Sequence, residues 1–553
     1  MQRRTRTRLS LSFVTVVAGL AAMSGTALGA VGLGPLRFFP SGSPFAGSAP
    51  TTQSVALNVQ GDAVVGEEVR SQNGTLATPT VRTRSGARGA WSPTAALAKP
   101  SNDTSEPQVA INAAGNRIAV FRRLGRYVAS RQRATGWTLS NIDAPAPTTD
   151  DVSAITITPS GRARFVHALP DAGCDPIPAT CPWTVWVYDQ AGAGAFWTRG
   201  DDSLRIPPTQ RPVIAVNGRG DVLVAWATPG ASGRVNASRR LVGATVFESP
   251  LSVSDPGVRG DVDAAIGAGG DAAIGWVHPD APGTGSGFTG RIDVSIRRDN
   301  LPLWASPETV VPAGAANPDF DLAVDSAANV VLAWTTFPAS AGAPFTVDAA
   351  IRSSATSVWV PSPRLDSAAT GDGESLTLLS VLAAGGRAFV TYEKHLGPDA
   401  GLERLAVGGP TGWNVRTLAG NADPTAANGD AARALGAVAQ NGSLILVSSG
   451  LQVRNDDAAT TLAAARAGGL AVKVTGRSAE LRFRLNTQSR VYVQRRSGAN
   501  FTRTGEYAPK IFPAGANRMN LGRLPIGRYL VGIGACSRSR GCTATRLVAF
   551  RIR

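Results

Sequence analysis

Two short apolar runs joined by a polar turn recur along the chain, most clearly in PVIAVNGRGDVLVAW at residues 212–226. The runs 213–216 and 222–226 are rich in β-branched and aromatic residues, which suit a pleated strand. Asn217 and Gly220 lie between the runs, and both residue types tolerate the left-handed backbone of tight turns. Because neither run alternates strictly between apolar and polar residues, the pattern predicts an antiparallel hairpin covered on both faces.

The hairpin pattern occurs eight times, at intervals of 46 to 59 residues. The positions equivalent to Gly220 are Gly61, Gly115, Gly161, Gly270, Ala328, Gly386 and Gly442. No helical pattern separates the copies. A repeat near this length without helices predicts an all-β fold, a β-propeller of four-stranded blades. We expect eight blades, with seven as the alternative if the degenerate copy around Gly442 is a loop.

Each hairpin is followed by two further strand signals. The third strand is a short run such as 292–296 or 347–351, and the fourth is marked by an aromatic residue. The seven markers are Trp91, Trp137, Trp197, Phe247, Trp304, Trp359 and Trp413. The missing eighth outer strand can come from residues 35–40, since Phe39 has the phase of these markers. We therefore predict that this segment pairs with the blade after Trp413 and closes the ring.

The N-terminus resembles a secretory signal. Arg3, Arg4, Arg6 and Arg8 precede an apolar run at 9–23, and small residues allow cleavage near 27–30. The sequence predicts a signal peptide (1–30), a propeller (31–455), a linker rich in Ala, Asp and Gly (456–469) and a small β-sandwich (470–553). We expect an extracellular protein, secreted or associated with the cell surface. We also expect a monomer without a transmembrane segment after cleavage.

The charge is unevenly distributed between these parts. The whole chain has a net charge of +16. Residues 1–30 contribute +4 and residues 466–553 contribute +16, so residues 31–465 carry −4. A mildly acidic repeat region thus precedes a strongly basic tail. The net positive charge is therefore not spread evenly over the protein. Nucleic acid would be an unusual partner for an exported chain.

The four cysteines form two local pairs, Cys174 with Cys181 and Cys536 with Cys542. In an exported chain such pairs favour disulfides. A zinc site is the alternative, but neither pair has the usual short ligand spacing. We therefore expect two disulfides and no resident metal.

One set of candidate ligand residues ends the second strand of each hairpin. Its members are Glu67, Phe121, His167, Trp226, Trp276, Trp334, Tyr392 and Ser448. The structural interpretation is that the large side chains wedge between blades as core. The functional interpretation is an aromatic-lined mouth that stacks on sugars or other flat ligands.

A second set consists of acids just before the inner strands: Glu106, Asp151, Asp261, Asp319, Asp372, Glu374 and Asp430. Carboxylates in such links often cap turns. The alternative is an acidic mouth for a cation, calcium included, or for a cationic ligand. No cofactor motif, histidine cluster or nucleophile elbow is present in the sequence.

The basic tail offers a third set. Arg482 and Arg484 alternate with Leu481, Phe483 and Leu485, so both should lie on one solvent-facing side of a strand. Other arginines that could join them are Arg490, Arg538 and Arg540. The set is either a solvated basic surface or a contact for anionic wall polymers or membrane phosphate.

The repeat resembles the secreted bacterial β-propeller repeats with the core P-x-V-A-V-N/D-x-x-G-N/D-x-x-V-x-W, which are loosely akin to sialidase-type propellers. The resemblance covers residues 50–450 and implies a fold, not an activity. The sialidase S-x-D-x-G-x-x-W box is absent from the sequence, and Leu204–Pro207 echoes that family's arginine motif in the wrong blade. The tail motif LPIGRY at 524–529 resembles immunoglobulin- or fibronectin-like modules.

Two functions follow from these patterns. The first is an exported, non-enzymatic binding protein whose propeller displays a ligand face, such as one for a glycan or wall polymer, and whose tail docks on a surface. The second is a carbohydrate-active enzyme, a glycoside hydrolase or lyase, that uses two carboxylates of the acidic mouth.

Overall fold

The structure is a computed structural model. It describes residues 37–38 and 51–552 except 72–74, 87–88, 90, 103–106, 134–135, 145–151, 172–180, 201, 210, 229–231, 258–261, 281–288, 317–318, 338–342, 370–373, 397–400, 410–411, 422–434, 440–443, 449–450, 455–466, 486–488, 498–501, 513–514, 538–540 and 543–545. All elements of this part of the chain are β-strands. None of the described residues forms a helix that is long and apolar enough to span a membrane.

The strands between residues 37 and 454 pair into antiparallel sheets. We number the sheets from 1 to 8 in the order in which their innermost strands follow one another along the chain. Sheet 1 consists of β2 (Thr51–Leu57), β3 (Ala63–Arg70), β4 (Ala77–Arg84) and β5 (Ala95–Ala96). Sheet 2 consists of β6 (Gln108–Ile111), β7 (Arg117–Arg123), β8 (Arg126–Arg133) and β9 (Gly136–Ile142). Sheet 3 consists of β10 (Val152–Ile157), β11 (Ala163–Pro170), β12 (Cys181–Gln190), β13 (Trp197–Arg199) and β14 (Leu204–Thr209). Sheet 4 consists of β15 (Val213–Val216), β16 (Val222–Ala227), β17 (Val235–Arg240) and β18 (Leu251–Ser252).

The next sheets repeat this order. Sheet 5 consists of β19 (Val262–Ile266), β20 (Ala272–Pro279), β21 (Thr289–Arg297) and β22 (Glu308–Ala316). Sheet 6 consists of β23 (Asp319–Val324), β24 (Val330–Thr336), β25 (Phe345–Arg352), β26 (Trp359–Pro361) and β27 (Asp366–Ala368). Sheet 7 consists of β28 (Glu374–Ala384), β29 (Arg387–Leu396), β30 (Gly401–Gly409) and β31 (Gly412–Asn421). Sheet 8 consists of β32 (Leu435–Val438), β33 (Leu444–Ser448), β34 (Leu451–Arg454) and β1 (Arg37–Phe38).

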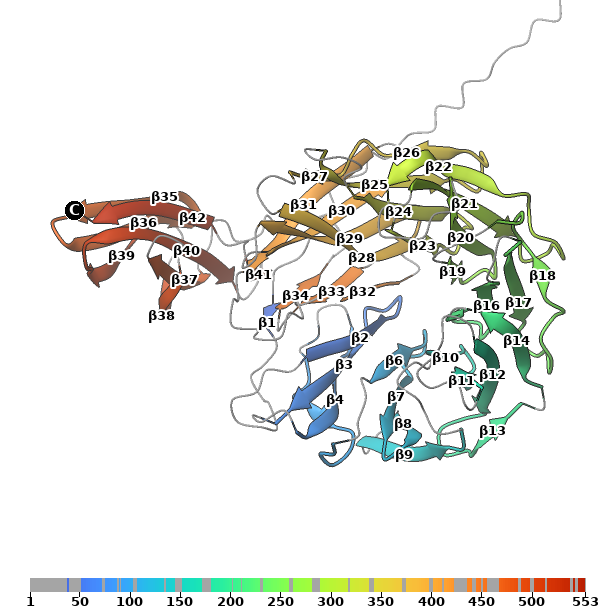
Figure 1. Cartoon of the computed structure of the whole chain (residues 1–553). Coiled ribbons are helices and arrows are strands. Elements are labelled where there is room, and N and C mark those ends of the chain that lie inside the picture. Colours follow the sequence, from blue (N-terminus) through green and yellow to red (C-terminus); the bar gives the residue numbers. More distant parts are fainter. Residues whose placement is uncertain are drawn as a thin grey trace, which may run out of the picture.

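The first strands of these sheets form a closed inner circle. Each contacts the first strand of the next sheet, and β32 of sheet 8 contacts β2 of sheet 1. In Figure 1 the first strand of each sheet lies toward the middle and the last toward the periphery. The fold is therefore a β-propeller, as the hairpin repeat predicts. The number of blades stays a prediction, because residues between the strands, 422–434 among them, lie outside the described part.

The hairpin turns adopt the backbone that their residues favour. Gly220 has a φ of 96°, and the equivalent positions from Gly61 to Gly386 also have positive φ. Ala328, the one position without glycine, keeps a positive φ of 63°. Gly442 lies outside the described residues. The turn geometry thus imposes the same backbone even where the side chain disfavours it.

The aromatic markers of the fourth strands are displaced in three sheets. Trp137, Trp197, Trp359 and Trp413 lie in the fourth strands β9, β13, β26 and β31. Phe247, Trp304 and Trp91 instead precede the strands β18, β22 and β5. Trp91 still forms a bridge with Arg84 of β4, and the amides that follow Phe247 and Trp304 donate to the third strands β17 and β21. All three aromatic residues therefore mark the fourth-strand segment, just before the strand itself begins.

The N-terminal segment contributes the outer strand of sheet 8. Arg37 lies opposite Gln452 and Phe38 lies opposite Leu451, in an antiparallel pair of β1 with β34. The predicted segment was longer, and its residues 35–36 and 39–40 lie outside the described part. The third strand of this sheet is β34, which lies within the predicted propeller range but was not predicted as a strand.

The tail forms two further sheets. One contains β35 (Ala467–Thr475), β36 (Ser478–Leu485) and β39 (Gly515–Arg523). The other contains β38 (Thr502–Phe512), β37 (Ser489–Ser497), β40 (Gly527–Ser537), β41 (Gly541–Cys542) and β42 (Arg546–Ile552). Leu481 and Phe483 of the first sheet share one buried cluster with Val493 and Val531 of the second. The tail is therefore a sandwich with its own core. Its first described strand begins at Ala467, and the predicted boundary at 470 stays a prediction because residues 455–466 lie outside the described part.

Candidate functional site

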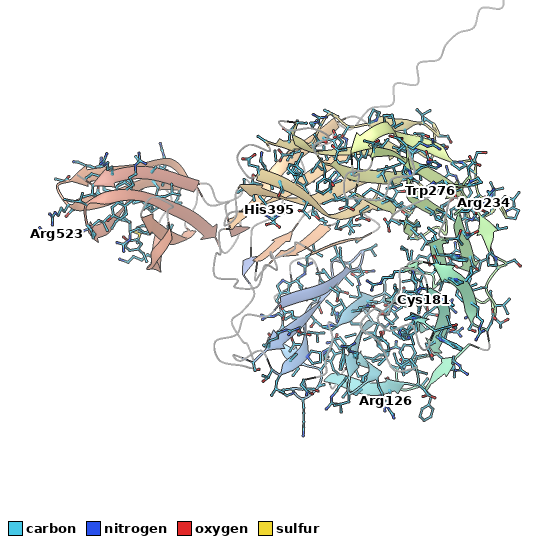
Figure 2. The ribbon with its side chains drawn as sticks, viewed as in Figure 1. Arg126, Cys181, Arg234, Trp276, His395 and Arg523 are labelled. Carbon is cyan, nitrogen blue, oxygen red and sulfur yellow. The ribbon has the colours of Figure 1, made fainter. Side chains whose placement is uncertain are left out.

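The large aromatic residues that end the second strands lie in the core between sheets. Trp226 and Trp276 are 2% and 1% exposed, and Tyr392 is fully buried. Trp226 packs in a cluster of sheets 3 and 4, and Trp276 packs in a cluster of sheets 4 and 5. Trp276 is labelled among the side chains of the ring in Figure 2. The Tyr392 hydroxyl donates to Asp366 at 3.2 Å, and burial raises the pKa of this tyrosine. The wedge interpretation, and not the open mouth, describes these side chains.

The remaining members of this set do not form a mouth either. His167 is fully buried and packs against Tyr127 and Phe165, with ring centroids 4.6 and 5.9 Å away. Trp334 is partly buried against the cluster between sheets 5 and 6. Phe121 is buried as well. Of Ser448 only the backbone is described, where it pairs with Leu451.

Glu67 occupies the equivalent position of sheet 1 as one half of a buried ion pair. Arg82 donates from Nε to its carboxylate at 2.8 Å, and both side chains are almost completely buried. Burial raises the pKa of Glu67, while the hydrogen bond and the charge of Arg82 lower it, and the effect of burial is larger. Glu67 therefore ties β3 to β4 and is not available to a ligand.

Most of the predicted acidic mouth lies outside the described residues. This holds for Glu106, Asp151, Asp261, Asp372 and Asp430. Asp319 is exposed, and Glu374 lies 3.5 Å from the Lys394 ammonium. The described residues contain no group of three or more His, Cys, Asp or Glu that could hold a metal ion. The acidic mouth therefore stays a prediction.

Two aspartates on the inner strands were not among the residues predicted from the sequence. Asp263 of β19 lies opposite Gly275, and Asp321 of β23 holds the equivalent place opposite Ala333. Their carboxyl groups hydrogen-bond to each other. The Leu322 amide donates to Asp263 at 2.9 Å, and the Val381 amide of β28 donates to Asp321 at 2.6 Å. The pair therefore links the inner strands of sheets 5, 6 and 7.

Burial raises the pKa of both carboxyl groups, and the negative charge of Asp263 raises that of Asp321 further. Two carboxyl groups in contact cannot both ionise cheaply, so the pair retains one proton where isolated aspartates are ionised. The sequence did carry a signal, because both residues interrupt apolar runs, VDAAI and FDLAV, at positions 58 residues apart. That interval equals the distance between the turn residues Gly270 and Ala328.

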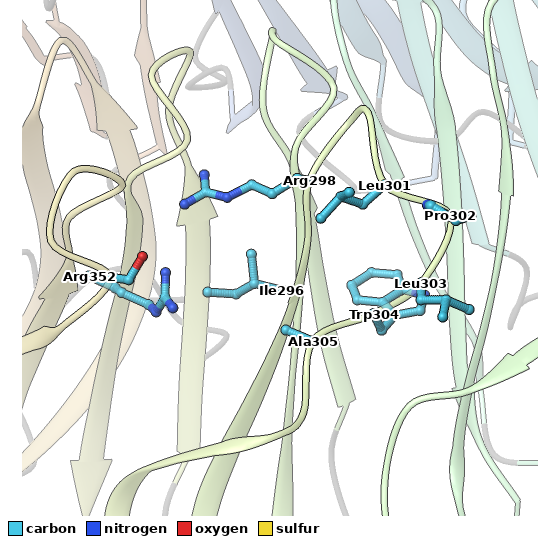
Figure 3. A pocket seen from close by; sticks show the side chains of 9 residues that line it. Ile296, Arg298, Leu301, Pro302, Leu303, Trp304, Ala305 and Arg352 are labelled. Carbon is cyan, nitrogen blue, oxygen red and sulfur yellow. The ribbon is translucent and has the colours of Figure 1, made fainter.

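A pocket of 380 Å³ lies at the periphery where the ends of β21 and β25 meet the loop 298–305. Its lining residues are Ile296, Arg298, Leu301, Pro302, Leu303, Trp304, Ala305, Arg352 and Ser357 (Figure 3). We call it the rim pocket. Figure 3 shows Trp304 on one side of it and Arg352 on the other. Trp304 is partly buried against the core of sheets 4 and 5, whereas Leu301 and Leu303 are 50% and 66% exposed.

The polar side of the rim pocket is held by the neighbouring strands. Arg352 donates to both carboxylate oxygens of Glu308 at 2.8 and 2.7 Å. Arg298 donates one Nη1 hydrogen bond to the Ala328 carbonyl at 3.2 Å and lies 3.7 Å from Asp271. A guanidinium has five N–H donors, so Arg298 keeps donors for a ligand. None of the described residues that line the rim pocket is acidic.

The cysteine pairs are described in part. Cys181 is disulfide-bonded, and Cys174 lies outside the described residues. Cys536 and Cys542 lie directly opposite each other in the antiparallel pair β40–β41. Both predicted pairings stay predictions, although each is compatible with these positions.

The predicted basic residues of the tail are also described in part. Arg484 is exposed and Arg482 is half-buried, while Leu481, Phe483 and Leu485 between them are buried. This is the alternation that the sequence predicts. The Arg490 side chain is not described, and Arg538 and Arg540 lie outside the described residues.

No protein-family model matches the chain, and no curated protein matches it. Several solved structures are similar. Sqt1 from Chaetomium thermophilum has a TM-score of 0.42 at 12% identity over 76% of this chain and 99% of its own. The β-propeller domain of the Trilobed protease from Pyrococcus furiosus has a TM-score of 0.39 at 8% identity over 68% of this chain and 99% of its own. The polysaccharide lyase Uly1 has a TM-score of 0.38 at 11% identity over 62% of this chain and 88% of its own. These values describe a similarity of fold and carry no conclusion about activity.

Proposed function

We propose that the protein is an exported carbohydrate-binding propeller and that the rim pocket is its ligand site. The observation that carries this proposal is Trp304, an indole at the wall of a 380 Å³ pocket beside Arg298. Ligand sites of about 300–1,000 Å³ typically combine apolar walls with a few polar groups that fix orientation. A sugar ring suits such a site because its C–H face packs on an aromatic ring while its hydroxyls accept hydrogen bonds from a guanidinium.

The proposed site binds its ligand without transforming it. The described residues of its lining include no carboxylate and no histidine, the groups that most often move protons in catalysis. The enzymatic alternative would need another site. Asp263 and Asp321 do not supply the geometry of an ordinary glycosidase, because they are hydrogen-bonded to each other and catalytic pairs stand about 5–9.5 Å apart.

The export half of the proposal rests on the signal-like residues 1–30. Sequencing the N-terminus of the protein recovered from the culture medium checks it. A start near residues 28–31 is the expected result, and an uncleaved chain retained in the cell contradicts it.

The ligand site is tested by Trp304→Ala on a panel of neutral and acidic oligosaccharides. We expect the affinity for any bound glycan to fall at least about tenfold, since the substitution removes the aromatic wall. Phe196→Ala is the matched control, because Phe196 is a 91% exposed aromatic residue on the equivalent loop of sheet 3. Equal binding by the wild-type protein and the Trp304 variant would refute the assignment of this pocket.

A further inference from the structure

The outer face of the three-stranded tail sheet carries charged side chains on all three of its strands, β35, β36 and β39. Glu480, Arg482 and Arg484 point away from the core along β36, because the alternate residues are buried. Lys473 of β35 and Arg518 of β39 are exposed and lie opposite this row. We call Lys473, Arg482, Arg484 and Arg518 the basic face.

Register places two arginines directly beside one another. Arg482 lies directly opposite Arg518, and Lys473 lies opposite Glu480. Cross-strand partners have Cβ atoms about 5 Å apart, and like charges at that distance destabilise a sheet. Arg484 follows Arg482 on the same face, about 7 Å further along the strand. The neighbouring arginines therefore repel one another, whereas Lys473 faces the opposite charge of Glu480.

One carboxylate compensates for only part of this charge. Arg482 donates to Glu480 at 2.8 Å, and this hydrogen bond, with the charges of Arg518 and Lys473 nearby, lowers the pKa of Glu480. Among the described residues, no ion pair holds Lys473, Arg484 or Arg518. The four cations of the basic face and the carboxylate of Glu480 together carry a net charge of +3. A bound polyanion would relieve this repulsion.

The side chains between the charges distinguish a dissolved polymer from a membrane. Ala471, Ala516 and Asn520 occupy the described positions of the outer face between the cations. None of them is a large apolar side chain of the kind that inserts into the boundary of a lipid bilayer. The surface is instead a flat array of separated cations, which suits a ligand with repeated anionic groups.

We propose that the basic face binds a linear, water-soluble polyanion of the acidic-polysaccharide class. Guanidinium groups bind carboxylate and sulfate groups through paired N–H donors, so a row of them favours repeated anionic sugars. The inference does not depend on the rim pocket. It assigns the tail a ligand of its own.

The test measures binding of the complete exported chain to polygalacturonate at low salt and at about 0.15 M salt, where charges are screened beyond about 8 Å. We expect wild-type protein to bind, and to bind more weakly at the higher salt. Arg484→Glu with Arg518→Glu should lower the affinity at least about tenfold. Arg484→Gln with Arg518→Gln should lower it less, which separates loss of attraction from added repulsion.

The matched control is Arg528→Glu with Arg551→Glu. These arginines also lie opposite each other and are exposed, but they belong to the other sheet of the tail. Equal losses in both double variants would show that only the net charge matters and would overturn the proposal. So would binding to vesicles of phosphatidylcholine and phosphatidylglycerol without binding to the polymer, or binding that ignores both substitutions. A retained near-ultraviolet circular dichroism spectrum shows that each variant is folded, and Trp304→Ala should leave polymer binding unchanged.

Discussion

At the scale of single residues, polar side chains on the inner strands join one sheet to the next. The Ser54 hydroxyl donates to the Pro107 carbonyl of the next sheet, and Gln108 donates to the Ser153 hydroxyl at 2.9 Å. Asp263 and Asp321 do the same between sheets 5, 6 and 7 by accepting backbone N–H groups. The aspartate pair differs from the others because its two members titrate together.

The aspartate pair makes stability depend on pH with a predictable sign. Its pKa values in the folded protein are raised above the unfolded value of about 3.9, so folding is favoured while the pair holds its protons. This contribution is complete below the unfolded pKa and is lost as pH rises through the folded pKa values. We expect Asp321→Asn to mimic the protonated group, to raise the melting temperature at neutral pH by about 2 °C or more, and to flatten this part of the pH profile.

The control for this prediction is Asp299→Asn. Burial opposes ionisation of Asp299, but hydrogen bonds from Arg239 and Arg219 outweigh it and lower its pKa. Asp299 therefore stabilises the fold above its unfolded pKa and loses that effect as pH falls. Thermal unfolding across the acid-to-neutral range should show opposite signs for the two substitutions. The same sign for both would contradict the assignment of a shared proton to the aspartate pair.

At the scale of elements, the hairpin turn also forms a contact between blades. The Asn217 Oδ1 accepts from the amides of Arg219, Gly220 and Asp221, while its Nδ2 donates to the Gly267 carbonyl of sheet 5 at 3.0 Å. The equivalent asparagines of sheets 1 and 2, Asn58 and Asn112, donate to the next turn in the same way. The turn signal in the sequence thus marks an inter-sheet hydrogen bond as well as a chain reversal.

The turn geometry predicts three different changes in stability when glycine and alanine are exchanged in the hairpin turns. Gly220→Ala should destabilise the protein by about 1–2 kcal/mol, because φ is 96° and the new Cβ would meet the Thr158 side chain at 3.0 Å. Gly218→Ala, two residues earlier, should cost less, because its Cβ would meet nothing within 4 Å and its φ is not positive. Ala328→Gly should stabilise by up to about 1 kcal/mol, since it relieves a positive φ of 63°. Denaturant unfolding measures all three, and a stabilising Gly220→Ala or a destabilising Ala328→Gly would show that backbone strain does not control these turns.

At the scale of the whole molecule, the two ends of the propeller meet in sheet 8. The β1–β34 pair brings residues 37 and 38 to the outer edge of a sheet whose other strands lie more than 390 residues later. A pairing this distant in sequence closes the ring and removes an unpaired strand edge. It should also oppose opening of the ring between its first and last sheets.

The closure is tested by comparing a chain that begins at Pro35 with one that begins at Ser41. We expect the shorter chain to unfold at a temperature several degrees lower, because sheet 8 loses its outer strand. Hydrogen exchange of β34 should rise in the shorter chain and stay low in β16, which lies on the far side of the ring. Unchanged exchange in β34 would mean that the N-terminal strand contributes nothing to closure.

The sequence by itself determined the repeating hairpins, the propeller class and the placement of Arg482 and Arg484 on one outward side of a strand. These depend on local periodicity and turn chemistry, which neighbouring residues decide. Tertiary structure alone decided which aromatic residues are buried. Trp226 and Trp304 are both tryptophans, yet the first wedges between sheets and the second lines a pocket. It also brought Asp263 to Asp321 and Arg482 to Arg518, because the packing of separate strands, and not their internal pattern, sets the distance between side chains far apart in sequence.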